Sequence, residues 1–188
     1  MVYPLESRER FPDALRVLLE TYPREVWEGH DNFSALIRFW LERHLMFRRL
    51  LEALENETLR ALDGNMEARL YVARLSRYGS LFVGELHGHH TIEDTHYFPQ
   101  LKLLEAKLAR GFDILDRDHH AIDGHLESFT DDANAVVRTV SDGGDWKTAT
   151  GDFQTGLQNL TRFLDRHLID EEELVVPVLL KHTPSGIT

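Results

Sequence analysis

One motif occurs twice in this chain and constrains its fold more than any other feature. Each copy has a histidine, a glutamate four residues later and a proline six residues after that. The two copies are His89, Glu93, Pro99 and His167, Glu171, Pro177. Residues four apart lie on the same face of a helix, so each imidazole is expected beside its carboxylate. Two such pairs that face each other would form a metal site with nitrogen and oxygen ligands.

The first copy alone leaves the helical register open. His90 with Asp94 has the same spacing, but the position that corresponds to His90 in the second copy is Leu168. Only the frame that begins at His89 has a histidine in both copies. The repeat therefore favours His89 over His90 as the ligand.

Composition limits the kind of metal site and the kind of partner. The 188 residues include no cysteine, so any metal must be held by imidazole and carboxylate groups. A net charge of -11 without a basic block argues against nucleic acid or an anionic membrane as partner. The first residues have no apolar run behind a basic start, and no run of about eighteen apolar residues occurs, so we expect a cytoplasmic protein.

Apolar residues recur with helical period along most of the chain. A short helix is expected between Pro12 and Pro23. A long helix should begin after Asp31 or Asn32, which would cap it, and end near Gly64. No period-two pattern of useful length is present, which predicts an all-α domain.

Three further long helices are expected. The second starts near Met66, is kinked or ended by Pro99, and has a continuation that stops at Gly111. The third follows directly. A loop spans residues 139–151, and the fourth helix then leads to Pro177.

The repeat extends beyond the two H-x3-E segments. When His44 is superimposed on His119, Trp40 falls on Leu115, and the following apolar positions also match. Helices one and two therefore correspond to helices three and four. We predict an up-down four-helix bundle with approximate internal twofold symmetry at residues 31–182, a short helical N-terminal extension at 1–30 and a tail at 183–188.

The predicted bundle would bury four imidazoles and two carboxylates, a costly arrangement without cations. Two divalent metals, each with two histidines and both bridged by the two glutamates, would use all six groups. The predicted ligands are His44, His89, Glu93, His119, His167 and Glu171. Such a donor set suits iron, manganese or zinc. The alternative is that His44 and His119 are core histidines that hydrogen-bond the glutamates without metal.

One histidine on each bundle helix, with H-x3-E on the second and fourth, resembles the hemerythrin-like (HHE cation-binding) family over about residues 31–181. The resemblance implies a centre of two iron ions (Fe²⁺ or Fe³⁺), bridged by oxide or hydroxide. The four histidines would be terminal ligands, with Glu93 and Glu171 as bridges. Manganese and zinc are not excluded.

The sequence departs from the oxygen-carrying members of that family at one position. Those members have a second histidine four residues after the third-helix ligand, where this chain has Asp123. Asp123 could therefore be an additional oxygen ligand. Glu172 is an alternative to Glu171, and His120 is an alternative to His119.

The resemblance implies a protein that binds or senses a small oxygen species such as O₂, NO or peroxide. An oxidoreductase or iron-handling protein, with ferroxidase or iron–sulfur repair activity, is the second hypothesis. A metal-free helical interaction module is the third. Whether the protein is an enzyme, and its oligomeric state, stay open.

Overall fold

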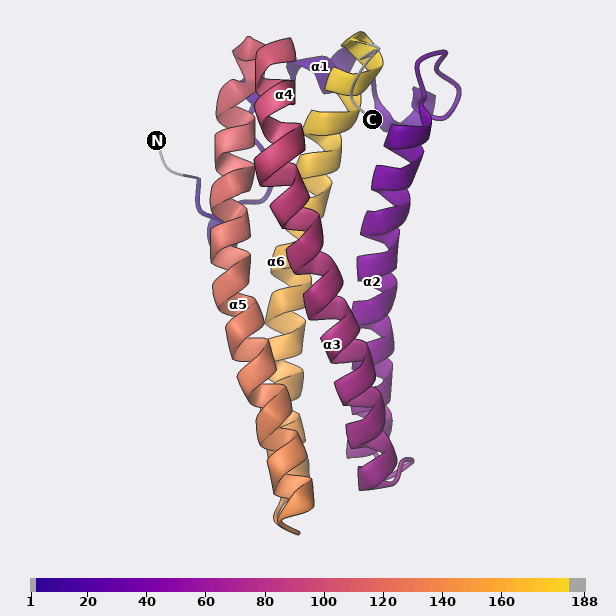
Figure 1. The fold of residues 1–188 in the computed structure, drawn as a ribbon, viewed down its shortest axis with the longest axis vertical. Helices are drawn as coiled ribbons and strands as arrows, with labels where there is room; N and C mark the ends of the chain where they lie inside the picture. The colour runs from indigo at the N-terminus through magenta and orange to yellow at the C-terminus, as the bar shows by residue number, and fades with distance from the viewer. Residues whose placement is uncertain (1–2, 183–188) are drawn as a thin grey trace. The chain divides into compact units, whose positions relative to one another are not determined.

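The structure, a computed structural model, describes residues 3–182, so the expected tail at 183–188 lies outside the described residues. Within that range the chain is helical and has no strand. Four long helices form most of it (Figure 1): α2 (Ala35–Leu62), α3 (Ala68–Ile92), α5 (Ala109–Ser141) and α6 (Trp146–His182). The prediction of an all-α helical bundle with a short helical N-terminal extension is confirmed.

The segment before α2 contains only short helical turns. They are η1 (Leu5–Ser7), η2 (Asp13–Leu15), α1 (Val17–Thr21) and η3 (Arg24–Val26). The helix expected between Pro12 and Pro23 is therefore present as η2 followed by α1.

The start of α2 differs from the expectation. The backbone N–H of Ile37 donates to Oγ of Ser34 at 3.3 Å, so Ser34 caps the helix and neither Asp31 nor Asn32 does. The amide of Asn32 donates instead to the carbonyl oxygen of Leu180 at 2.7 Å. Asn32 thus connects the segment before α2 to the end of α6. Preferences for helix-capping residues cannot predict such a contact, because they depend only on neighbours in sequence.

Pro99 ends α3 as expected. A π-helical turn, η4 (Glu93–Tyr97), follows α3 directly and leads into α4 (Phe98–Leu104), with Pro99 in the first turn of α4. Proline has no N–H to donate to the preceding turn, so the regular α-helical hydrogen bonding is interrupted here. The wide turn begins at Glu93, one of the predicted ligands.

The expected helix end at Gly111 is wrong. α4 ends at Leu104, the turn η5 (Ala106–Leu108) follows, and α5 already begins at Ala109. A Cβ atom at Gly111 would lie 2.7 Å from Cδ2 of Leu174, so this glycine permits close approach of α5 and α6 rather than ending a helix.

Two other boundaries also differ from expectation. The loop predicted at 139–151 is limited to the residues between Ser141 and Trp146, and it contains Gly143 with a φ of 71°. α6 continues through Pro177 to His182. The chain therefore stays helical over most of residues 139–151 and across Pro177, because helix propensity and packing outweigh the local tendency of glycine and proline to end a helix.

The chain forms two compact units that share the long helices. The described part of the first comprises residues 3–45, 89–120 and 165–182, and the second comprises residues 46–88 and 121–164. In the first unit, buried apolar residues of the N-terminal extension and of α2, α4, α5 and α6 form one core; they include Phe11, Trp40, Leu101, Phe112 and Val178.

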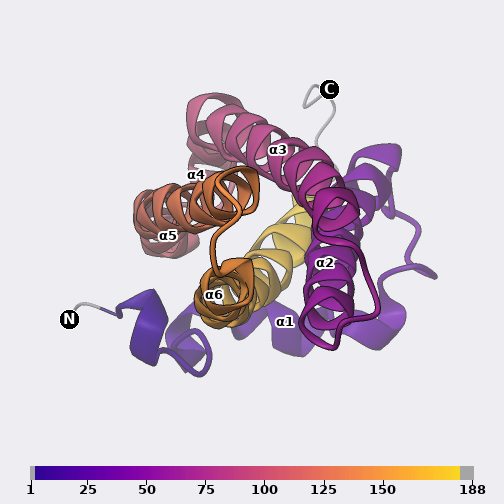
Figure 2. The same ribbon diagram turned by 90° about the horizontal axis from the view of Figure 1, so that it is seen from below.

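The core of the second unit contains one phenylalanine from each long helix. Phe47 contacts Phe82 with ring centroids 6.4 Å apart, Phe82 contacts Phe129 at 5.8 Å, and Phe129 contacts Phe153 at 5.3 Å. Figure 2, in which the loops joining α2 to α3 and α5 to α6 face the viewer, shows the four segments of this unit side by side. Among residues 3–182, no helix combines the length and the apolar character that a membrane span requires.

Candidate metal centre

All six predicted ligands lie in the first unit. They are His44 on α2, His89 near the end of α3, Glu93 at the start of η4, His119 on α5, and His167 with Glu171 on α6. Five of the six are buried, and the side chain of His89 is 9% exposed.

The four imidazoles form two pairs. Nε2 of His44 lies 3.1 Å from Nε2 of His89, and Nε2 of His119 lies 3.2 Å from Nε2 of His167. Each pair combines one histidine of an H-x3-E motif with the histidine of the preceding long helix. The two pairs are therefore related by the internal repeat, which by itself left open which imidazoles pair.

Each glutamate has one oxygen toward each pair. Oε1 of Glu93 lies 2.9 Å from Nε2 of His89, and its Oε2 lies 3.6 Å from Nε2 of His119. Oε1 of Glu171 lies 3.1 Å from Nε2 of His44, and its Oε2 lies 3.2 Å from Nε2 of His167. Two positions result, each near two nitrogens and two oxygens, with both carboxylates between them.

Several polar atoms of this cluster have no hydrogen bond within the described chain. Both carboxylate oxygens of Glu93 and Oε2 of Glu171 are buried without a partner in acceptable geometry, although imidazole nitrogens lie nearby. Unpaired buried carboxylate oxygens are costly, and proteins normally pair them or use them to bind metal. The residues therefore fit divalent cations, and their role as ligands stays a prediction.

The two carboxylates have opposite pKa shifts. Burial, together with the charge of Glu171, raises the pKa of Glu93 well above its usual range. Burial also acts to raise the pKa of Glu171, but the nearby imidazoles of His44 and His167 outweigh it and hold that pKa well below its usual range. Without metal, burial therefore favours the neutral form of Glu93, and the neighbouring imidazoles favour the ionised form of Glu171.

The histidines divide in the same way. Burial lowers the pKa of His89 to about 3 and also lowers that of His119. For His167, the nearby carboxylates of Asp118 and Glu171 outweigh burial and raise the pKa to about 9. The pKa of His44 is raised because the charge of Glu171 outweighs burial. In the metal-free protein, proton binding at both imidazoles is therefore favoured by the carboxylates beside them.

The residue after each of the two glutamates, Glu93 and Glu171, orients a histidine from another helix. Oε1 of Glu172 lies 3.0 Å from Nδ1 of His44, and Oδ1 of Asp94 lies 2.8 Å from Nδ1 of His119. A carboxylate at Nδ1 fixes the ring orientation and leaves Nε2 for a metal. Glu172 is therefore placed to support His44 rather than to replace Glu171.

The other two alternatives do not join the cluster. His120 is exposed, which places it away from the buried imidazoles. Asp123 belongs to the second unit, where it lines a cavity with His87 and Asp131. Neither residue is among those whose ligand atoms converge within 4.8 Å.

The N-terminal extension contacts two of the supporting carboxylates. Arg8 binds Asp118, whose Oδ2 lies 3.5 Å from Nδ1 of His167, and Nη1 of Arg24 lies 2.7 Å from Oε2 of Glu172. The sequence of this segment predicts only a short helical extension. The two residues of each ion pair lie more than 100 positions apart, so the spacing of residues in the sequence could not predict these contacts.

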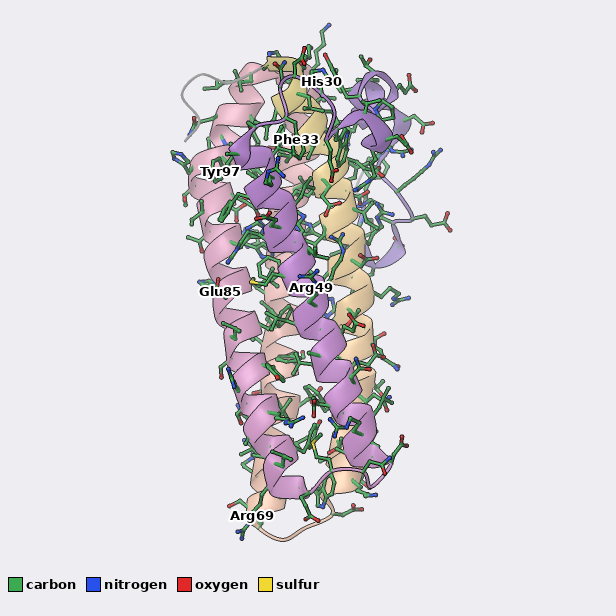
Figure 3. All side chains as sticks on the ribbon, turned by 90° about the vertical axis from the view of Figure 1, so that its right-hand side faces the viewer. His30, Phe33, Arg49, Arg69, Glu85 and Tyr97 are labelled. Carbon is green, nitrogen blue, oxygen red and sulfur yellow. The ribbon has the colours of Figure 1, made fainter. Side chains whose placement is uncertain are left out.

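Two aromatic residues cover the centre. Nε1 of Trp40 donates to Oε1 of Glu171. The ring of Tyr97, which is labelled in Figure 3, packs edge-on against Trp40 with centroids 5.0 Å apart. These large side chains exclude water from this side of the carboxylates.

His90 also lies in the centre, although the repeat favoured His89 over it. His90 is buried, and its ring is stacked on that of His119 with centroids 3.9 Å apart. Burial, with the charges of neighbouring imidazoles, lowers its pKa well below the usual value. His90 follows the apolar Leu86 by four residues and so lies on the same helix face. This spacing could have predicted that the side chain of His90 points into the core.

The fold and this cluster define an all-α domain whose histidines and glutamates could hold metal cations. A family model described as the hemerythrin HHE cation binding domain matches residues 35–179, and the chain belongs to that family. No curated protein and no solved structure matched the chain in two further comparisons.

Proposed function

We propose that the chain holds two iron ions at this centre and binds a small oxygen species, O₂, NO or peroxide, at an open metal position. The observation that carries the proposal is the division of the donors into two nitrogen pairs with one oxygen of each glutamate toward each pair. Membership of a cation-binding family supports the same view.

In this proposal His44 and His89 would hold one ion, His119 and His167 would hold the other, and Glu93 and Glu171 would offer oxygen ligands to both. When bound, iron would supply reversible redox chemistry and affinity for small oxygen ligands.

The protein's own residues would prepare the site. Asp94 and Glu172 would accept from Nδ1 of His119 and His44, which aims the Nε2 atoms of both rings at the centre. The N–H of Trp40 keeps the plane of Glu171 in place. Apolar and aromatic burial limits water and raises the strength of each charge interaction.

Metal content tests the proposal. After aerobic expression with iron, we expect about two equivalents of iron per chain and an optical charge-transfer band in air that bleaches on reduction and returns with O₂. A content below about one equivalent would contradict a binuclear centre. Peroxide turnover that is lost in Glu93→Ala would favour an oxidoreductase instead of a binding protein.

Adjacent histidines provide a matched control. His119→Ala removes a buried predicted ligand, whereas His120→Ala changes an exposed neighbour on the same helix. We expect iron content and the optical band to fall in the first variant and to stay unchanged in the second. Equal iron content in both variants would exclude His119 as a ligand.

A further inference from the structure

Three arginines of the N-terminal extension, Arg8, Arg16 and Arg24, each form an ion pair with a carboxylate of α6. The backbone N–H of Phe11 adds a hydrogen bond to Oδ1 of Asp170 at 3.1 Å. The family model begins at residue 35, so the extension lies outside the matched domain. The role of these contacts therefore has to follow from the structure of this chain.

Arg24 reaches one predicted ion position through Glu172. Nη1 of Arg24 lies 2.7 Å from Oε2 of Glu172, and the other oxygen of this carboxylate lies 3.0 Å from Nδ1 of His44. The side chain of Glu172 is 5% exposed, so both contacts form where little water competes. An arginine that fixes Glu172 therefore also fixes the ring of His44.

Arg8 reaches the other predicted ion position through Asp118. Its guanidinium contacts both oxygens of Asp118, and Oδ2 of that carboxylate lies 3.5 Å from Nδ1 of His167. A planar guanidinium that makes two contacts holds the plane of a carboxylate. The extension thus contacts the carboxylate beside one histidine at each ion position.

Arg16 is a matched comparison on the same segment. Its Nε lies 3.2 Å from Oε2 of Glu173. In the described part of the chain, Glu173 pairs with Arg16 and Arg24 and with no imidazole. The contact of Arg16 therefore adds the same kind of charge to α6 without a route to a predicted ligand.

We propose that Arg24 and Arg8 are positioning residues of the metal centre: each holds the carboxylate that contacts Nδ1 of one predicted ligand. The inference rests on the proposed function. A metal would take Nε2 of the ring, and the carboxylate at Nδ1 sets the direction of that ring. Because the arginine keeps the carboxylate in place, the ring has less freedom to lose when metal binds. The extension therefore increases the metal affinity of both positions.

The direct test compares Arg24→Gln with Arg16→Gln, which lose the same charge from the same segment. In Zn²⁺-loaded protein with ¹⁵N-labelled histidine, we expect Nδ1–H of His44 to exchange with solvent at least about 10-fold faster in Arg24→Gln than in the wild type, because its acceptor becomes mobile. Arg16→Gln should leave that rate unchanged. Arg24→Lys, which keeps the charge, should restore most of the protection.

The ring of His119 is an internal control, because its Nδ1 faces Asp94 instead. Its exchange rate in Arg24→Gln should equal that of the wild type. Equal acceleration at His119 and His44 would mean a general loosening of the fold and would overturn the inference. In chelator competition, Arg24→Gln should lose about 3- to 10-fold in metal affinity relative to Arg16→Gln.

Arg8→Lys tests the second contact. Lysine keeps the charge beside Asp118 but cannot make the two-point contact of a guanidinium, so Nδ1–H of His167 should exchange faster while that of His44 keeps its wild-type rate. If Arg8→Lys failed to fold, the Arg24 variants would still decide the inference.

The outcomes separate the two proposals. Wild-type protein that binds less than about one equivalent of iron defeats the proposed function itself. If the wild type passes this threshold, an unchanged His44 exchange rate in Arg24→Gln, or equal metal affinity in Arg24→Gln and Arg16→Gln, overturns only the role of the extension.

Discussion

Arg8 binds both oxygens of Asp118, with Nη1 3.2 Å from Oδ1 and Nη2 close to Oδ2. Nε of the same guanidinium lies 2.8 Å from Oδ2 of Asp170 on α6. All three side chains are buried. Because Asp118 also faces Nδ1 of His167, this contact joins the N-terminal extension to the metal centre.

Arg8→Ala should destabilise the protein strongly. The change leaves the buried Asp118 without its guanidinium and Asp170 with Arg166 as its remaining cation, a loss of about 3–5 kcal/mol in the free energy of unfolding. Arg10→Ala is the control because Arg10 pairs with Asp13 in solvent, and we expect a loss of at most about 1 kcal/mol. Denaturant unfolding of both variants measures the difference, and equal stabilities would refute the structural role of the Arg8 contact.

Asp94→Asn should weaken metal binding while the helices stay folded. Asparagine cannot supply the charge that orients His119 through Nδ1, so we expect metal affinity to fall about 10- to 100-fold. Asp123→Asn, in the second unit, should leave affinity unchanged. Chelator competition with circular dichroism as the folding check would measure both. If Asp123→Asn lost more metal affinity than Asp94→Asn, Asp123 would again be a candidate ligand.

Metal affinity should increase with pH. The pKa of His167 is raised to about 9 in the metal-free protein, so at neutral pH this imidazole holds a proton that an incoming cation must displace. We expect proton release on loading at pH 7, tighter binding as pH approaches 9, and loss of metal in acid. Titration in weak buffer with a pH indicator measures the released protons. Metal retained down to about pH 3 would contradict imidazole ligation.

Alkaline pH should destabilise the second unit through Tyr71. Burial raises the pKa of Tyr71 to about 12, even though its hydroxyl hydrogen-bonds Thr58. In the unfolded chain this phenol ionises near pH 10, so the folded state loses stability as pH rises from about 10 to 12, by up to about 3 kcal/mol. Tyr71→Phe should show a smaller loss over that interval in denaturant titrations. An identical pH dependence in both proteins would exclude Tyr71 as the cause.

Two helical glycines should respond in opposite directions to alanine. Gly111→Ala places Cβ against Leu174 and should destabilise by about 1–3 kcal/mol. Gly124→Ala meets no atom within 4 Å and should stabilise by about 0.5–1 kcal/mol. Thermal unfolding of the two variants compares them under the same conditions. A stabilising Gly111→Ala would mean that α5 and α6 can separate without loss.

The sequence predicted the long helices and the six candidate ligands, because both follow from periodicity along a segment and from the internal repeat. It left open which imidazoles pair; the structure places His44 beside His89 and His119 beside His167. Helix boundaries were less accurate. Gly111 and Pro177 have local tendencies to end a helix, but packing against other helices keeps these positions helical.

By itself the sequence determined that the protein is all-helical and which imidazole and carboxylate groups share helix faces, because spacing along a helix sets direction. Only the tertiary structure decided that His90 is buried beside His119, that Asp94 and Glu172 support the rings, and that Arg8 neutralises Asp118. Those relationships join residues from different elements, and burial and charge pairing arise only when the elements pack together.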